Sequence, residues 1–126
     1  LSSSSAASDV YKRQIYIDTV IIENQISPIA NRMKTLQGMI AQYFIMKNTT
    51  DIQFISAANK LKEFVTTKTT YAERKYKGIE ICEEILINND IFGKHLDMFH
   101  KHKKKDDLAD CFLQGIWYLR DIIIYN

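Results

Sequence analysis

The chain has 126 residues, of which 46% are hydrophobic and 25% charged, and its formal net charge is +2 at pH 7. This length and composition are typical of a single soluble globular domain. The small net charge excludes binding to nucleic acid through overall basicity, so any basic surface must be local. The best candidate for a membrane span, residues 116–125, is shorter than the roughly 20 residues required and is interrupted by Arg120 and Asp121. We therefore expect no membrane partner.

The first fourteen residues read LSSSSAASDVYKRQ and show no apolar periodicity. They are similar to translated adapter or vector sequence, and they lack the apolar segment of a secretory signal. We expect residues 1–14 to be an irregular, non-native leader and residues 15–126 to form the domain.

Residues 15–25 are rich in Ile, Val, Tyr and Thr, which favours a strand covered on both faces in an α/β sheet. The strand ends in Glu23, Asn24 and Gln25, and Pro28 prevents its continuation. Open α/β sheets bind ligands at the ends of such strands. The alternative is an ordinary polar strand end that leads into a turn.

Two helices and a second strand are predicted next. Residues 31–47 carry apolar side chains at helical spacing, residues 51–55 form a short strand, and residues 63–70 form a loop. Residues 71–88 form another helix. The apolar positions that we expect to face the core are Met33, Leu36, Ile40, Tyr43 and Phe44 in the first helix, and Ile79, Cys82, Ile85 and Leu86 in the second.

The first half of the helix at 71–88 carries Arg74, Lys75 and Lys77. Cations at this end oppose the helix dipole, which indicates an anionic partner. The alternative is a solvated basic surface.

Residues 89–105 are polar and basic, and we expect a flexible approach loop that suits phosphates. The loop contains His95, His100 and His102 and ends in three consecutive lysines. The His-x-His pair is an alternative half-site for zinc, but no cysteine or acid lies at a matching spacing.

The last helix begins in an acidic cluster. Asp107 and Asp110 are three residues apart and therefore lie one turn apart on a similar face. Such a carboxylate pair is a half-site for a hard divalent cation such as Mg²⁺, and the alternative is simple capping of the helix. A separate apolar stripe should face the core through Leu108, Cys111, Phe112, Gly115 and Leu119. Because Cys82 and Cys111 fall on apolar faces, we expect both to be buried free thiols in a reducing compartment.

Three segments together resemble a known family. They are Ile22-Glu23-Asn24-Gln25, Met33-Lys34-Thr35-Leu36-Gln37-Gly38-Met39-Ile40, and Lys104-Lys105-Asp106-Asp107-Leu108-Ala109-Asp110. Together they resemble the RuvC-type Holliday junction resolvases of the RNase H-like superfamily. The closest branch is that of poxviruses and other large DNA viruses, which is related to the fungal mitochondrial resolvases. The resemblance extends from about residue 19 to residue 119.

The resemblance implies an α/β, RNase H-like fold and a two-metal endonuclease that uses Mg²⁺, or Mn²⁺ in its place, on branched DNA. Of the family's four metal-binding carboxylates, Glu23, Asp107 and Asp110 match three by position. Asp106 resembles an auxiliary acid or cap, and Lys75 or Lys77 matches the family's catalytic lysine. The DNA contacts that we expect are Lys34, Arg74, Lys103, Lys104 and Lys105.

The resemblance also indicates what is absent. The family's first catalytic Asp lies on an N-terminal strand, and neither Asp9 nor Asp18 matches it. We therefore expect a partial RNase H-like domain that lacks the first three strands and the first helix, with little or no activity by itself. The implied setting is intracellular, in the host cytoplasm for a viral protein, and a homodimer is implied by the symmetry of the junction. The alternatives are a non-catalytic module for branched-DNA binding or dimerisation, and a generic α/β domain.

Overall fold

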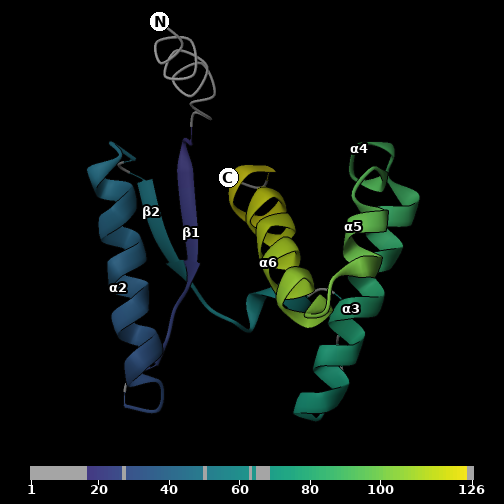
Figure 1. The fold of residues 1–126 in the computed structure, drawn as a ribbon, viewed down its shortest axis with the longest axis horizontal. Coiled ribbons are helices and arrows are strands. Elements are labelled where there is room, and N and C mark those ends of the chain that lie inside the picture. Colours follow the sequence, from purple (N-terminus) through teal and green to yellow (C-terminus); the bar gives the residue numbers. More distant parts are fainter. Residues whose placement is uncertain (1–16, 27, 50, 63, 65–68, 125–126) are drawn as a thin grey trace, which may run out of the picture. The chain divides into compact units, whose positions relative to one another are not determined.

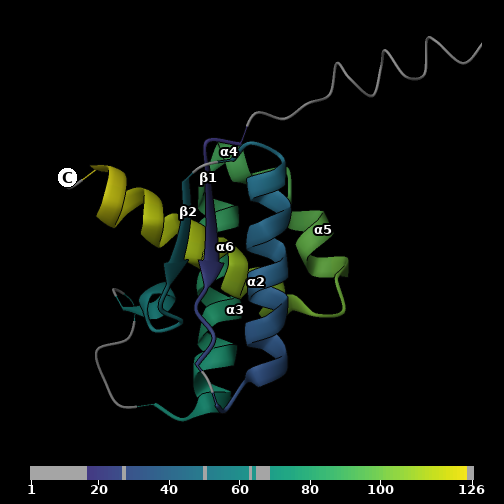
Figure 2. The same ribbon diagram turned by 90° about the vertical axis from the view of Figure 1, so that its left-hand side faces the viewer.

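The computed structural model describes residues 17–26, 28–49, 51–62, 64 and 69–124. The expected leader, residues 1–14, lies outside this range. The chain divides after Ile55 into two compact units (Figures 1 and 2). The molecule is mixed α/β and mostly helical. In the described part of the chain, no helix is both long and apolar enough to cross a membrane.

The N-terminal unit is a β-α-β arrangement. Strands β1 (Thr19–Glu23) and β2 (Asp51–Ile55) pair in parallel, with Thr19 opposite Asp51 and Glu23 opposite Ile55. Parallel neighbours require a crossover, which α2 (Asn31–Met46) provides as it runs alongside both strands (Figure 2). The Thr19 hydroxyl donates to Asp51 Oδ2 over 2.6 Å, and this bond lowers the pKa of Asp51.

The predicted helix at 31–47 and strand at 51–55 are confirmed, whereas β1 is shorter than predicted and only half-buried. Helix α2 ends where Asn48 adopts a left-handed conformation, with φ of 64°. The amide N–H groups of Asn48 and Thr49 donate to the carbonyls of Ile45 and Phe44, as in a Schellman motif with asparagine in place of glycine.

The apolar stripe of α2 does not face a core, which corrects the expectation for that helix. Met33, Leu36, Ile40 and Tyr43 are exposed, and Phe44 is half-buried. The buried residues of α2 are Gln37 and Ala41. The physical reason is that a sheet of two strands is narrow, so it covers only a thin strip of the helix beside it.

The C-terminal unit is helical. It contains a 3-10 turn, η1 (Asn59–Leu61), and the helices α3 (Tyr71–Asn88), α4 (Asp90–Gly93), α5 (Leu96–Lys101) and α6 (Lys105–Tyr118), followed by a π-helical turn, η2 (Leu119–Ile124). Its core is formed by the buried side chains Leu61, Ile81, Cys82, Leu86, Phe99, Ala109 and Leu113.

The predicted helix at 71–88 is confirmed at both ends. A capping box starts it: the amide of Glu73 donates to the Thr70 hydroxyl, and the Glu73 carboxylate accepts from the amide of Thr70. The expected core positions Cys82 and Leu86 are buried, and the other two pack against the core. Most of the predicted loop at 63–70 lies outside the described residues.

The segment at 89–105 is not the flexible loop that its polarity predicts. It forms α4 and α5, and Phe99 is only 2% exposed. The ring of Phe92 packs edge-on against Phe112 of α6, with centroids 5.3 Å apart. Three apolar side chains, those of Phe92, Leu96 and Phe99, join this segment to the core despite the basic residues around them.

The buried face of α6 also differs from the predicted one. Ala109 and Leu113 are fully buried, Leu108 and Phe112 lie at the margin of the core, and Cys111 is exposed. Leu119 is exposed as well. The helix packs against the core through Ala109. The predicted face consists mainly of larger apolar side chains, and Ala109 is not among them. Cys82 is a buried free thiol as predicted, and burial raises its pKa to about 11.

Candidate active site

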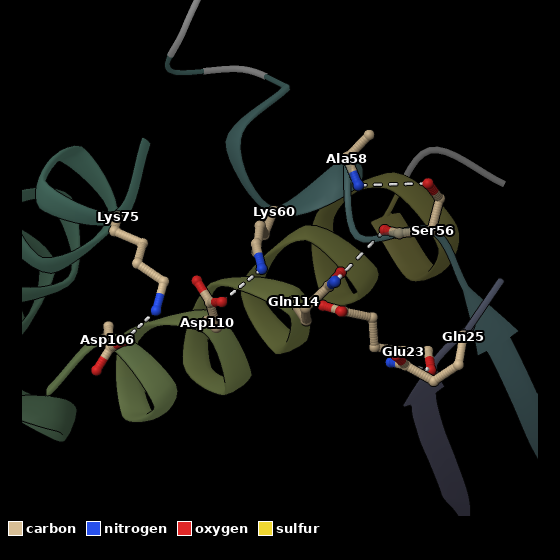
Figure 3. A network of polar contacts seen from close by, with 9 residues as sticks. All are labelled: Glu23, Gln25, Ser56, Ala58, Lys60, Lys75, Asp106, Asp110 and Gln114. Atoms are coloured by element: carbon tan, nitrogen blue, oxygen red, sulfur yellow. Dashed lines mark hydrogen bonds and ion pairs between the residues drawn. The ribbon is translucent and has the colours of Figure 1, made fainter. Parts of the chain in front are cut away.

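Three aspartates occupy the first two turns of α6. Asp106 and Asp107 lie in the first turn, and Asp110 lies one turn later. Asp107 is exposed, whereas Asp106 and Asp110 are half-buried. Each of these two half-buried carboxylates accepts from a lysine that comes from another element of the C-terminal unit, as Figure 3 shows. The helix therefore presents acids that are already paired with cations.

Lys60 contacts Asp110. Its ammonium lies 2.6 Å from Asp110 Oδ2, and the side chains are 15% and 36% exposed, respectively. Lys60 belongs to the 3-10 turn η1, whose next residue, Leu61, is in the core. The sequence interpretation missed Lys60, because a single lysine in a segment without periodicity carries no signal of its own.

Lys75 contacts Asp106. The two groups are 2.6 Å apart, and this hydrogen bond lowers the pKa of the Asp106 carboxyl and raises that of the Lys75 ammonium. The ammonium also lies 5.3 Å from the centre of the Tyr71 ring. Lys77, the other candidate for the family's lysine, lies 3.7 Å from Glu80 of its own helix. Of the two lysines, Lys75 is the one that reaches α6.

Gly78 of α3 lies beside Asp110 and Leu113 of α6. It is buried, and a β-carbon at this position would lie 3.9 Å from both Asp110 Oδ1 and Leu113 Cδ1. One oxygen of Asp110 thus lies toward the backbone of α3, while the other accepts from Lys60. Lys60 therefore orients the carboxylate through Oδ2.

Glu23 is the last residue of β1 and is half-buried. The chain beyond it is attached to the rest of the N-terminal unit: the amide of Asn24 donates to the Ile55 carbonyl over 2.8 Å, and the amide of Gln25 donates to Gln37 Oε1 over 2.8 Å. The buried Gln37 thereby joins α2 to the polar end of the strand. The three carboxylates of the expected site come from both units, Glu23 from one and the pair on α6 from the other.

The expected DNA contacts are distributed over several elements. Lys34 donates to Asn24 Oδ1 over 3.0 Å, and Arg74 donates to the Thr69 carbonyl over 2.7 Å. Lys103 and Lys104 are exposed, and Lys105 is half-buried.

Two of the three histidines make side-chain contacts within the protein. His100 Nε2 lies 2.5 Å from a carboxylate oxygen of Glu83, and His102 Nδ1 accepts from the amide of Lys104 over 3.1 Å. Within the described ranges, no group of three or more His, Cys, Asp and Glu side chains is arranged to hold a metal ion.

A comparison with known proteins identifies the family of this chain. The family described as Poxvirus A22 protein matches residues 2–122. The chain belongs to this family. The A22 proteins are the Holliday junction resolvase family of poxviruses.

A relative among curated proteins is an uncharacterized protein of Acanthamoeba polyphaga mimivirus. It is 30% identical over 129 aligned positions, which cover 85% of this A22-family chain and 30% of the relative. The chain thus spans less than a third of the length of that protein. No solved structure matches. Both matches are to proteins of large DNA viruses, in line with the viral branch that the motifs resemble.

Proposed function

We propose that the intact protein is a Mg²⁺-dependent endonuclease that resolves four-way DNA junctions by hydrolysing phosphodiester bonds, with Mn²⁺ as a substitute. Membership of the A22 family over residues 2–122 is the observation that carries the proposal. The acidic start of α6 supplies side chains of the required chemistry.

The donors on α6 suit a hard divalent cation, which prefers carboxylate oxygens. Asp107 is exposed, and Asp110 contributes a second carboxylate one turn later. Glu23 is the third ligand that we assign. When bound, such cations activate water and stabilise the leaving oxygen of a phosphodiester. The carboxylates of Glu23, Asp107 and Asp110 would hold the cations. Lys75, which contacts Asp106, places a positive charge at the same end of α6.

We also assign the chain to the RNase H-like fold. The parallel β-α-β unit supports this assignment, because Glu23 lies at the carboxyl end of β1, where α/β sheets bind ligands. Only three of the family's four carboxylates have a match in this sequence. We therefore expect this chain to bind junctions but to cleave them very slowly, even with Mg²⁺ or Mn²⁺.

Contacts to DNA are assigned to Lys103, Lys104 and Lys105 at the start of α6, together with Arg74 and Lys34. Two of these lysines are exposed and lie within a few residues of Asp107. Lysines of this kind contact phosphates rather than bases, so selectivity would come from the shape of the junction.

Fluorescence anisotropy with labelled DNA tests this function. The full chain should bind a four-way junction more tightly than a linear duplex of the same sequence, and the affinity should fall steeply as salt rises, because phosphate contacts release counterions. Replacing Lys103 and Lys104 with Gln should weaken binding and reduce the salt dependence. Equal affinity for both DNAs would contradict the assignment.

A non-catalytic module for branched-DNA binding is the second candidate, and the paired state of Asp106 and Asp110 favours it, since acids neutralised by lysine need no metal. Asp107→Asn with Asp110→Asn separates the two candidates. A nuclease loses its residual Mn²⁺-dependent cleavage and keeps junction binding, whereas a pure binding module shows no cleavage before or after the change.

We propose that the chain forms a homodimer and that α2 provides its contact. Met33, Leu36, Ile40 and Tyr43 of α2 are all exposed, and they are spaced three, four and three residues apart. Alternating spacings of three and four residues let two helices pack along a continuous apolar seam. Helix α2 has no acidic residue, so it lacks the charges that would attract a basic partner helix. A second copy of the chain suits this seam, and two-fold symmetry matches the junction.

A further inference from the structure

The backbone that carries Lys60 is anchored to the core of the C-terminal unit and is not a free surface loop. Its neighbour Leu61 is 8% exposed and packs in the core with Ile81 and Leu113. The amide of Lys62 donates to the Asn59 carbonyl and closes the turn around Lys60. The backbone that carries the lysine is therefore anchored immediately beside it.

A second contact attaches the same segment to α6. The side-chain amide of Gln114, a residue only 5% exposed, donates to the Ser56 carbonyl over 3.4 Å. Gln114 lies one turn beyond Asp110, on the same helix. The segment from Ser56 to Leu61 thus contacts α6 at two levels, through the Ser56 carbonyl at Gln114 and through Lys60 at Asp110 (Figure 3).

The pair is more sheltered than a usual surface ion pair, since the Lys60 side chain is 15% exposed. Partial burial makes both charges depend on one another, because either one left alone would lose hydration without compensation. The surface pair of Lys101 and Asp97 contrasts with it: the groups are 3.9 Å apart, and the side chains are almost fully exposed. Of these two ion pairs, the pair of Lys60 and Asp110 is the closer and the more buried.

We propose that Lys60 is the resident counter-ion of Asp110 and competes with a divalent cation for its carboxylate. The proposal rests on the cation site proposed above. The ammonium holds Oδ2, one of the two oxygens through which Asp110 would bind a cation. Lys60 is a positioning residue that acts through Asp110: it orients the carboxylate while no cation is bound, and it lowers the affinity for the cation that replaces it.

Titration of the full chain with MnCl₂, followed by calorimetry and by the electron paramagnetic resonance of free Mn²⁺, tests the proposal. Lys60→Met keeps the length and apolar stem of the side chain and removes its charge. We expect about five- to tenfold tighter Mn²⁺ binding, the size expected when one positive charge is removed a few ångströms from a cation. Lys60→Arg keeps the charge and should bind as weakly as the parent chain.

Lys101→Met is the matched control, because it removes the lysine of an exposed Lys–Asp pair and should leave Mn²⁺ affinity unchanged. Asp110→Asn should abolish the gain in the Lys60→Met background. A merely structural lysine would lower thermal stability and would not tighten Mn²⁺ binding. Circular dichroism of each variant separates these effects.

A second measurement needs no variant. Mg²⁺ added to the parent chain should shift the side-chain ammonium signal of Lys60 in nuclear magnetic resonance spectra and leave that of Lys101 in place. Unchanged or weaker Mn²⁺ binding by Lys60→Met, with binding still sensitive to Asp110→Asn, would overturn the role of Lys60 alone. Mn²⁺ binding insensitive to Asp110→Asn in every variant would overturn the cation site itself, and this proposal with it.

Discussion

Two of the three aspartates on α6 are each paired with a lysine, whereas the third is exposed to solvent. Asp106 and Asp110 each accept from a lysine at 2.6 Å, while Asp107 is exposed. The sequence placed all three acids at the start of a helix, because acids before an apolar run are typical of a first turn. It did not reveal their partners, since Lys60 and Lys75 come from distant segments that only the packing of the core brings to α6.

The Asp106–Lys75 pair should make stability depend on acidity. The lowered pKa of Asp106 means that its contribution is fully present above the ordinary carboxyl pKa of 3.8 and is lost as pH falls through the lowered value. Asp106→Asn should therefore flatten the loss of unfolding free energy below about pH 4, as measured by urea denaturation at several pH values. Asp97→Asn, at an exposed pair, is the control and should keep the parent profile.

The two thiols should react differently. Cys111 is exposed, whereas Cys82 is buried and its pKa is raised to about 11. At pH 8 a thiol reagent should label one cysteine of the native chain, and Cys111→Ser should abolish this labelling. Both thiols should react after denaturation. Rapid labelling of Cys82 in the native chain would show that this part of the core is wrongly described.

At the scale of elements, periodicity predicted the long helices and failed for short ones. The bounds of α2 and α3 follow from apolar spacing sustained over several turns. Helices α4 and α5 are too short to show such a period. Their segment is polar and basic overall, so the sequence did not indicate that three of its apolar side chains pack in or against the core. The buried face of α6 depends on Ala109 and on the neighbouring helices, which the sequence of α6 alone does not contain.

The capping box of α3 offers a test at this scale. The Thr70 hydroxyl accepts from the amide of Glu73, and Thr70→Ala should lower the unfolding free energy by about 1 kcal/mol, the usual cost of losing an N-cap. Urea denaturation measures the change. Thr35→Ala, on the exposed surface within α2, should cost nothing, since alanine is the better helix former. Equal losses in both variants would contradict the capping role.

At the scale of the whole molecule, the apolar seam of α2 is the largest departure from the expected core. Met33, Leu36, Ile40 and Tyr43 have the spacing of a buried face and remain exposed. The sequence predicted the seam but not its exposure, because a narrow sheet covers so little of the helix. The proposed dimer contact rests on this exposed surface.

Substitutions in the seam test the dimer. Leu36→Glu with Ile40→Glu should convert the chain from dimer to monomer in sedimentation velocity experiments, because each change places a charge in the apolar contact. Ile87→Glu, at an exposed apolar residue of α3, is the matched control and should remain dimeric. A parent chain that sediments as a monomer at micromolar concentration would refute the assigned contact.

The proposed function requires Glu23, Asp107 and Asp110 to bind the same divalent cations. A crystal structure of the full chain grown with Mn²⁺, with the metal located by its anomalous scattering, measures this directly. If the proposed function holds, anomalous density should lie within coordination distance of Asp107 and Asp110, and the carboxylate of Glu23 should complete the site. Mn²⁺ absent from α6, or bound there with Glu23 far from it, would contradict the claim and leave these aspartates as helix caps and lysine partners.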